Sequence, residues 1–115
     1  SGDTRPSTNL IQATARDGIS LLLHEATFDD DERGKKEAIQ KKHSTVLEAL
    51  DVAKRMRAKA SLLTHFSQRY PKSPPGWENN ENAAFAVDGM WFPLTDAAIE
   101  KLPSLSRLVQ QTLCD

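Results

Sequence analysis

The sequence lacks the features that mark several classes of protein. Its one cysteine, Cys114, excludes an internal disulfide or a cysteine-rich zinc site, and a position one residue from the end suits a bystander better than a nucleophile. No apolar run approaches the roughly 18 residues of a membrane span, and no signal peptide is visible. Charge of one sign is also missing, with 15 Lys and Arg against 16 Asp and Glu. Nucleic-acid binding by bulk charge alone is therefore excluded, whereas a local basic face remains open.

Hydrophobic residues are also scarce, at 38% of the 115 residues. A free-standing domain of this size would bury its core with little to spare. The sequence has no initiator methionine at its start and begins within the polar residues 1–6. We therefore expect residues 1–115 to form a single C-terminal portion of a longer protein.

Hydrophobic periodicity predicts helices and strands in alternation through the first half of the chain. A short helix is predicted with Pro6 in its first turn and Gly18 beyond its end. Residues 19–24 form an apolar run whose length favours a buried strand, and such strands usually lie in sheets covered on both faces. Residues 44–58 carry a clean apolar stripe behind a capping box, which predicts a helix. Residues 61–64 read as a second buried strand.

Two polar segments and an apolar tail complete the pattern. Residues 29–42 have acids first and bases later, which favours a solvated loop or short exposed helix over an acidic metal site. Residues 71–82 are rich in proline and asparagine and predict a loop. Residues 83–87 and 90–94 resemble strands, and a last helix over 97–113 would be bent or divided by its proline. The order predicts an α/β fold with unpaired sheet edges, as in half of a larger sheet.

Three histidines are the first candidates for chemistry. His24 and His65 end predicted strands, and His43 directly precedes the N-cap of the predicted helix. Open α/β sheets place functional groups at the carboxyl ends of strands. A histidine at a strand end is, taken alone, more often a structural hydrogen-bond partner, and Asp3 alone is most simply a turn or capping residue. The three histidines together favour a functional site.

Four short strings change that balance. They are residues 1–6 (SGDTRP), 24–28 (HEATF), 43–45 (HST) and 64–70 (THFSQRY), in that order along the chain. They resemble the C-terminal motifs of tRNase Z, the tRNA 3′-processing endoribonuclease of the metallo-β-lactamase superfamily. The last string and the tail 84–90 (AFAVDGM) look most like the long, eukaryotic form. The resemblance covers nearly the whole chain and implies the C-terminal part of an αββα sandwich, incomplete without an N-terminal portion.

The resemblance also implies roles for particular residues. Asp3 matches the aspartate that bridges two zinc ions, and His65 matches a histidine ligand of one of them. Glu25 and His43 match a pair thought to protonate the departing ribose 3′-oxygen. A carboxylate that hydrogen-bonds one imidazole nitrogen fixes its tautomer, and the other nitrogen can then give up a proton. Ser67 and Arg69 would orient the metal-ligand segment or contact phosphate, although packing of the His65 loop explains them equally well.

The family's His-x-His-x-Asp-His metal loop is absent from these residues. Two protein ligands fall short of the four or so that each zinc takes, so this chain alone is expected to be inactive. The resemblance implies two partners: an N-terminal portion of the same enzyme, which carries that loop, and precursor tRNA. It implies removal of the 3′ trailer to leave a tRNA 3′-hydroxyl, in the nucleus, the mitochondrion or the cytoplasm.

Two alternatives remain open. The segment could be a non-catalytic half that acts as a scaffold or interaction module and pairs its open sheet edge with a partner. A scaffold has no reason to retain Asp3, Glu25, His43 and His65 together, which favours the enzyme. The segment could also come from a different hydrolase of the superfamily, and the HEAT and HST strings argue against that.

Overall fold

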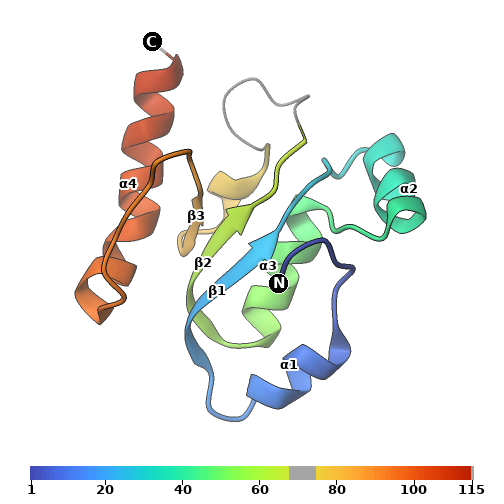
Figure 1. The fold of residues 1–115 in the computed structure, drawn as a ribbon, viewed down its shortest axis with the longest axis horizontal. Helices are drawn as coiled ribbons and strands as arrows, with labels where there is room; N and C mark the ends of the chain where they lie inside the picture. The colour runs from blue at the N-terminus through green and yellow to red at the C-terminus, as the bar shows by residue number, and fades with distance from the viewer. Residues whose placement is uncertain (68–74, 115) are drawn as a thin grey trace.

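The structure is a computed structural model that describes residues 1–67 and 75–114. Helices are interspersed with strands along the chain (Figure 1). The elements are α1 (Thr8–Thr14), β1 (Ile19–Glu25), α2 (Glu32–Lys41), α3 (Val46–Arg55), β2 (Ala58–Thr64), the 3-10 turn η1 (Trp77–Asn79), β3 (Ala83–Phe85) and α4 (Asp96–Cys114).

The three strands form one parallel sheet in the order β1-β2-β3. Ile19 lies opposite Ala58 and Glu25 lies opposite Thr64, so the carboxyl ends of β1 and β2 are level. A parallel sheet with helical crossovers confirms the α/β fold class. The register matters for function because it brings whatever follows β1 and β2 to one edge of the sheet.

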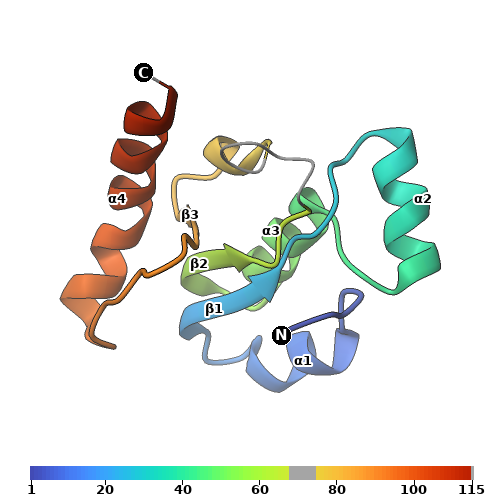
Figure 2. The same ribbon diagram turned by 45° about the horizontal axis from the view of Figure 1, so that its top comes forward.

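Helices cover both faces of the sheet (Figure 2). On one face, Leu50 of α3 belongs to the same buried cluster as Leu63 and Phe85. Alternate strand residues point the other way, where Leu62 packs with Leu102 of α4. The expectation that β1 is covered on both faces is met only in part, because Leu23 is 48% exposed.

Several predicted elements are confirmed. The strand over 19–24 is β1, and the strand predicted over 61–64 is β2, which begins earlier, at Ala58. Helix α3 has Thr45 as its N-cap and Glu48 completing the capping box, as predicted. The polar segment 29–42 contains a short helix, α2, with Asp31 as N-cap and Lys41 in its last turn, which suits the helix dipole.

The predicted strand over 90–94 is wrong, and the one over 83–87 stops at Phe85. The Ala86 N–H still donates to the Leu63 carbonyl, but a turn at Gly89, with a φ of 81°, then carries the chain away from the sheet. Proline at position 93 removes a further strand donor. The apolar residues that suggested a strand are therefore split between the packing under α4 and the surface, where Trp91 is 84% exposed.

One proline prediction is wrong, and one of two alternatives is excluded for another. Helix α1 begins at Thr8 behind the N-cap Ser7, so Pro6 precedes the helix and does not lie in its first turn. Pro103 does not divide α4, which runs unbroken from Asp96 to Cys114. A proline inside a helix removes one N–H donor and crowds the preceding turn, so the bend at Pro103 stays a prediction. In the described ranges, no helix is long and apolar enough to cross a membrane.

The predicted loop over 71–82 falls partly outside the described residues, which resume at residue 75. Its described part holds η1, and Trp77 there is fully buried with its ring edge-on to Phe85 at 5.0 Å between centroids. A loop that carries a buried tryptophan is anchored to the core rather than free on the surface.

We expect Gly34→Ala to loosen α2. A Cβ at Gly34 would lie 2.1 Å from the Asp29 carbonyl oxygen, so the backbone itself must move. Such overpacking typically costs about 1–3 kcal/mol. Amide hydrogen exchange of α2 in the full-length protein should accelerate, whereas the exposed Lys36→Ala on the same helix should leave it unchanged. Equal exchange in Gly34→Ala would show that the close approach is not a constraint.

Candidate active site

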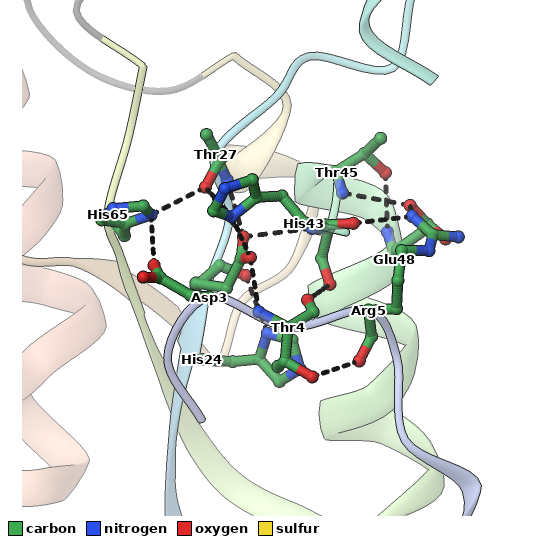
Figure 3. Close-up of polar contacts among 11 residues, drawn as sticks. Asp3, Thr4, Arg5, His24, Thr27, His43, Thr45, Glu48 and His65 are labelled. Atoms are coloured by element: carbon green, nitrogen blue, oxygen red, sulfur yellow. Dashed lines mark hydrogen bonds and ion pairs between the residues drawn. The ribbon is translucent and has the colours of Figure 1, made fainter. Parts of the chain in front are cut away.

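Polar side chains converge at the carboxyl ends of β1 and β2 (Figure 3). Glu25 is the last residue of β1, and His65 directly follows β2. His43 lies two residues before the N-cap of α3. Asp3 joins them because Ser1 is tied to the edge of β1, where its carbonyl accepts from the Glu25 N–H at 3.0 Å. Segments distant in sequence thus meet at one end of the sheet.

The Glu25 carboxylate is the buried centre of this group, with no exposed surface. Its Oε1 accepts from the Thr4 N–H at 2.8 Å and contacts His43 Nδ1 at 2.7 Å. Its Oε2 accepts from the Thr27 N–H at 3.1 Å, the Thr27 hydroxyl at 2.9 Å and the Ser44 N–H at 3.1 Å. Burial opposes ionisation, but the hydrogen bonds from Ser44, His43 and Thr27 hold the pKa of Glu25 below its ordinary value.

His43 is held against Glu25 by the backbone around it. A parallel bridge joins Phe28 to Thr45, and the His43 N–H donates to the Ala38 carbonyl at the end of α2. Because an ionised carboxylate only accepts, His43 must present Nδ1–H to Glu25, which leaves the other ring nitrogen for chemistry. The His43 ring also stacks on the His65 ring, with 5.3 Å between centroids.

Asp3 and His65 form the outer pair of the site. Asp3 Oδ1 lies 3.2 Å from His65 Nδ1, and both side chains are more than half exposed. Both residues have positive φ, 47° for Asp3 and 58° for His65, a conformation that costs a non-glycine residue about 1–2 kcal/mol. Strained backbone of this kind clusters at functional sites, where the surrounding structure holds it in place.

The donor set suits a zinc ion. Asp3, His43 and His65 each offer one ligand atom, and these three atoms lie within 4.8 Å of one another. Carboxylate oxygen and imidazole nitrogen are ordinary zinc ligands, and a zinc site takes about four. The cluster includes His43, which the sequence predicted as an acid rather than a ligand. Three donors on this segment therefore fit part of a zinc site that needs further ligands.

Thr4 and Arg5 connect the Asp3 segment to the His43 loop, a connection that the sequence motifs did not predict. The Ser44 hydroxyl donates to the Thr4 carbonyl at 2.5 Å. Arg5 donates to the His43 carbonyl at 2.8 Å and forms a bidentate pair with Glu48. The only sequence signal was indirect, since Glu48 was already placed beside this loop by the capping box.

The remaining predicted residues lie apart from this cluster or outside the described part of the chain. The Ser67 N–H donates to the Thr27 carbonyl at 3.0 Å, so Ser67 borders the site. Arg69 lies outside the described residues. His24 is fully buried, and its Nδ1 lies 2.7 Å from the Glu25 carbonyl oxygen. His24 therefore supports the strand end and does not join the other two histidines.

His24 should make stability depend on pH. Burial lowers the pKa of His24 from 6.5, so the folded protein keeps the ring neutral while the unfolded chain binds a proton below about pH 6.5. Acidification therefore costs stability, by up to about 1.4 kcal/mol per pH unit for one proton. In urea unfolding of the full-length protein from pH 8 to 5, His24→Asn should show a shallower loss than the unsubstituted protein. Parallel losses would contradict this.

Known proteins resemble this chain closely, although no family model matches it. "Ribonuclease Z 2, mitochondrial" of Schizosaccharomyces pombe is 52% identical over 95 residues, 78% of this chain and 13% of that protein. "Zinc phosphodiesterase ELAC protein 2 homolog" of Caenorhabditis elegans is 40% identical over 111 residues, 95% of this chain and 12% of that protein. The chain thus spans about an eighth of the length of these curated relatives.

Solved structures agree with the sequence matches. The crystal structure of a long form RNase Z from yeast matches 99% of this chain, and 15% of that chain, at 34% identity with a TM-score of 0.77. The human short form tRNase Z matches 66% of this chain, and 25% of that chain, at 38% identity with a TM-score of 0.51. The better match to the long form agrees with the motif resemblance. This segment belongs to the ribonuclease Z (tRNase Z) family.

Proposed function

We propose that this segment is part of a zinc-dependent endoribonuclease that removes the 3′ trailer from precursor tRNA and leaves a tRNA 3′-hydroxyl. The observation that carries the proposal is the juxtaposition of the Glu25–His43 pair, whose carboxylate is buried, with the Asp3–His65 pair at one sheet edge. The first pair suits proton transfer, and the second suits metal binding. Relatives named ribonuclease Z and zinc phosphodiesterase support the same reaction.

Asp3 and His65 would hold zinc in the complete protein. A carboxylate has two oxygens, so Asp3 can bridge two ions, and His65 would complete one of them. The remaining ligands would come from an N-terminal portion that carries the His-x-His-x-Asp-His loop. When bound, zinc supplies Lewis-acid stabilisation of phosphate charge and lowers the pKa of water. With three donors in its own cluster, residues 1–115 alone should not turn over substrate.

Glu25 and His43 would protonate the leaving 3′-oxygen. Glu25 accepts the Nδ1–H of His43 and thereby fixes the ring, so that the other nitrogen can hold the transferable proton. The ring is 20% exposed, which leaves it accessible from the site. Because Glu25 is buried and already holds several donors, it positions His43 and does not itself meet the substrate.

Ser67 and Arg69 are proposed to contact substrate phosphate or to orient the segment that carries His65. Ser67 borders the site through its contact with the Thr27 carbonyl, which supports this for Ser67. For the compartment, we propose the mitochondrion, because several relatives carry that word in their names. The nucleus and the cytoplasm remain further proposals from the motif resemblance alone.

The test is cleavage of a trailer-bearing precursor tRNA by the full-length, zinc-loaded protein. The tRNA product should end in a 3′-hydroxyl and the trailer should begin with a 5′-phosphate. Asp3→Asn should lose both zinc and cleavage, since a bridging carboxylate is replaced by a neutral amide. The matched change Asp51→Asn, at an exposed position on α3, should retain both. Failure of the zinc-loaded protein to cleave, or a tRNA product ending in a phosphate, would reject the proposal.

A further inference from the structure

Thr27 joins the two halves of the site. Its hydroxyl oxygen lies 2.9 Å from Glu25 Oε2 and 2.9 Å from His65 Nδ1. A longer contact of 3.4 Å reaches His43 Nδ1. The side chain is almost fully buried, at 8% exposure of the residue. One hydroxyl therefore touches both the acid pair and the metal-binding pair (Figure 3).

A hydroxyl has one proton, and the neighbouring groups decide where it goes. Glu25 is surrounded by donors, including the N–H groups of Thr27 and Ser44, so its carboxylate is ionised and can only accept. If the Thr27 proton pointed away from Glu25, two oxygens would face each other at 2.9 Å without a proton between them. The hydroxyl therefore donates to Glu25 Oε2.

The proton on His65 follows from the same reasoning. With its proton committed to Glu25, the Thr27 oxygen can only accept from His65 Nδ1. Asp3 Oδ1 also lies 3.2 Å from this nitrogen, at ion-pair distance, and leaves the proton assignment to the Thr27 contact. The Thr27 contact thus requires a hydrogen on Nδ1. Nε2 of His65 is left with a lone pair, which is the form of imidazole that binds a metal.

We propose that Thr27 is a positioning residue, which fixes the tautomer and the ring orientation of His65 so that its Nε2 is presented to zinc, and which links this metal-binding histidine to Glu25. The proposal rests on the proposed function for the identity of the metal. Groups that orient metal-ligating histidines in this way typically change metal affinity or activity by about 10–100-fold when they are removed.

Two substitutions separate the hydroxyl from the shape of the side chain. Thr27→Val removes the hydroxyl and keeps the branched shape, whereas Thr27→Ser keeps the hydroxyl and removes the methyl. The matched change Thr112→Val removes an exposed hydroxyl that donates to the Leu108 carbonyl within α4. All three are made in the full-length protein. The first readout is zinc affinity, from competition with a chelator of known strength.

Thr27→Val should bind zinc about 10–100-fold more weakly, and Thr27→Ser and Thr112→Val should bind it like the unsubstituted protein. Under saturating zinc, Thr27→Val should lower kcat for precursor tRNA and leave KM unchanged, because the hydroxyl does not meet the substrate. Unchanged zinc affinity in Thr27→Val would overturn the proposal. So would an equal loss in Thr27→Ser, since packing and not the hydroxyl would then matter.

The two proposals can fail separately. If the unsubstituted protein does not cleave precursor tRNA, the proposed function fails, and the zinc competition still tests the role of Thr27. If the unsubstituted protein cleaves and Thr27→Val matches it in zinc affinity, the role of Thr27 fails alone.

Discussion

His43→Ala should slow cleavage of precursor tRNA by about 10²–10⁴-fold, the usual contribution of a positioned general acid, while the zinc content of the full-length protein stays unchanged. Glu25 holds His43 at 2.7 Å through Nδ1, so the ring is fixed with its second nitrogen available. An alkoxide is a poor leaving group, and a proton from that nitrogen would let the 3′-oxygen leave as a neutral hydroxyl. The measurement is single-turnover cleavage at saturating enzyme, alongside zinc analysis of the same preparation.

A substrate with a better leaving group isolates this role. In a precursor whose scissile 3′-oxygen is replaced by sulfur, the thiolate departs without needing a proton. His43→Ala should therefore cleave the sulfur substrate nearly as fast as the unsubstituted protein does, although it is slow on the oxygen substrate. An equal deficit on both substrates would show that His43 does not protonate the leaving group.

The structure makes this experiment necessary because it offers His43 a second role. A His43 nitrogen lies in the same cluster as ligand atoms of Asp3 and His65, all within 4.8 Å. A ligand role predicts loss of zinc in His43→Ala, and an acid role predicts full zinc with slow chemistry. Zinc loss in His43→Ala would show that His43 is a metal ligand and not the general acid.

Local sequence signals predicted the parts of the fold that local physics determines. The capping box of Thr45 and Glu48 fixes the start of α3, and the apolar run over 19–24 fixes β1. Parallel pairing of β1 with β2 then brings Glu25 and His65 to the same sheet edge. The prediction failed over 90–94, where apolar residues pack on α4 or face solvent instead of pairing in the sheet.

The finer geometry of the site depends on contacts that sequence patterns do not encode. Thr27 meets His65 across 38 positions, and Arg5 meets Glu48 across 43. Neither pair has a periodic or motif signal of its own. The positive φ of Asp3 and His65 is similarly invisible, because these residue types do not demand it as a turn glycine does. The motifs predicted which residues are candidates for the site, whereas the hydrogen bonds that connect those residues could be seen only in the folded structure.

Glu25→Gln should disable the site more broadly than its small change in shape suggests. Each carboxylate oxygen of Glu25 accepts from at least two donors, so the new amide nitrogen faces two or more N–H or O–H groups in either orientation. Leaving buried donors unpaired costs about 1–3 kcal/mol each, and removing one partner of a buried charged network about 3–5 kcal/mol. Segments 25–28 and 43–46 should therefore exchange amide hydrogens faster.

The same substitution should lower the cleavage rate at least as much as His43→Ala, because His43 loses the acceptor that fixes its ring. Exposed Glu100→Gln on α4 is the matched control and should change neither exchange nor rate.

The pKa of Glu25 is held below its ordinary 4.5, so the stability that the Glu25 carboxylate contributes is present above that pH and is lost only as the pH falls through the lower folded value. The gap between Glu25→Gln and the unsubstituted protein should therefore stay constant from pH 5.5 to 8. A gap that narrows as the pH falls within that range would mean that Glu25 is protonated in the folded site and no longer accepts from His43 as a carboxylate.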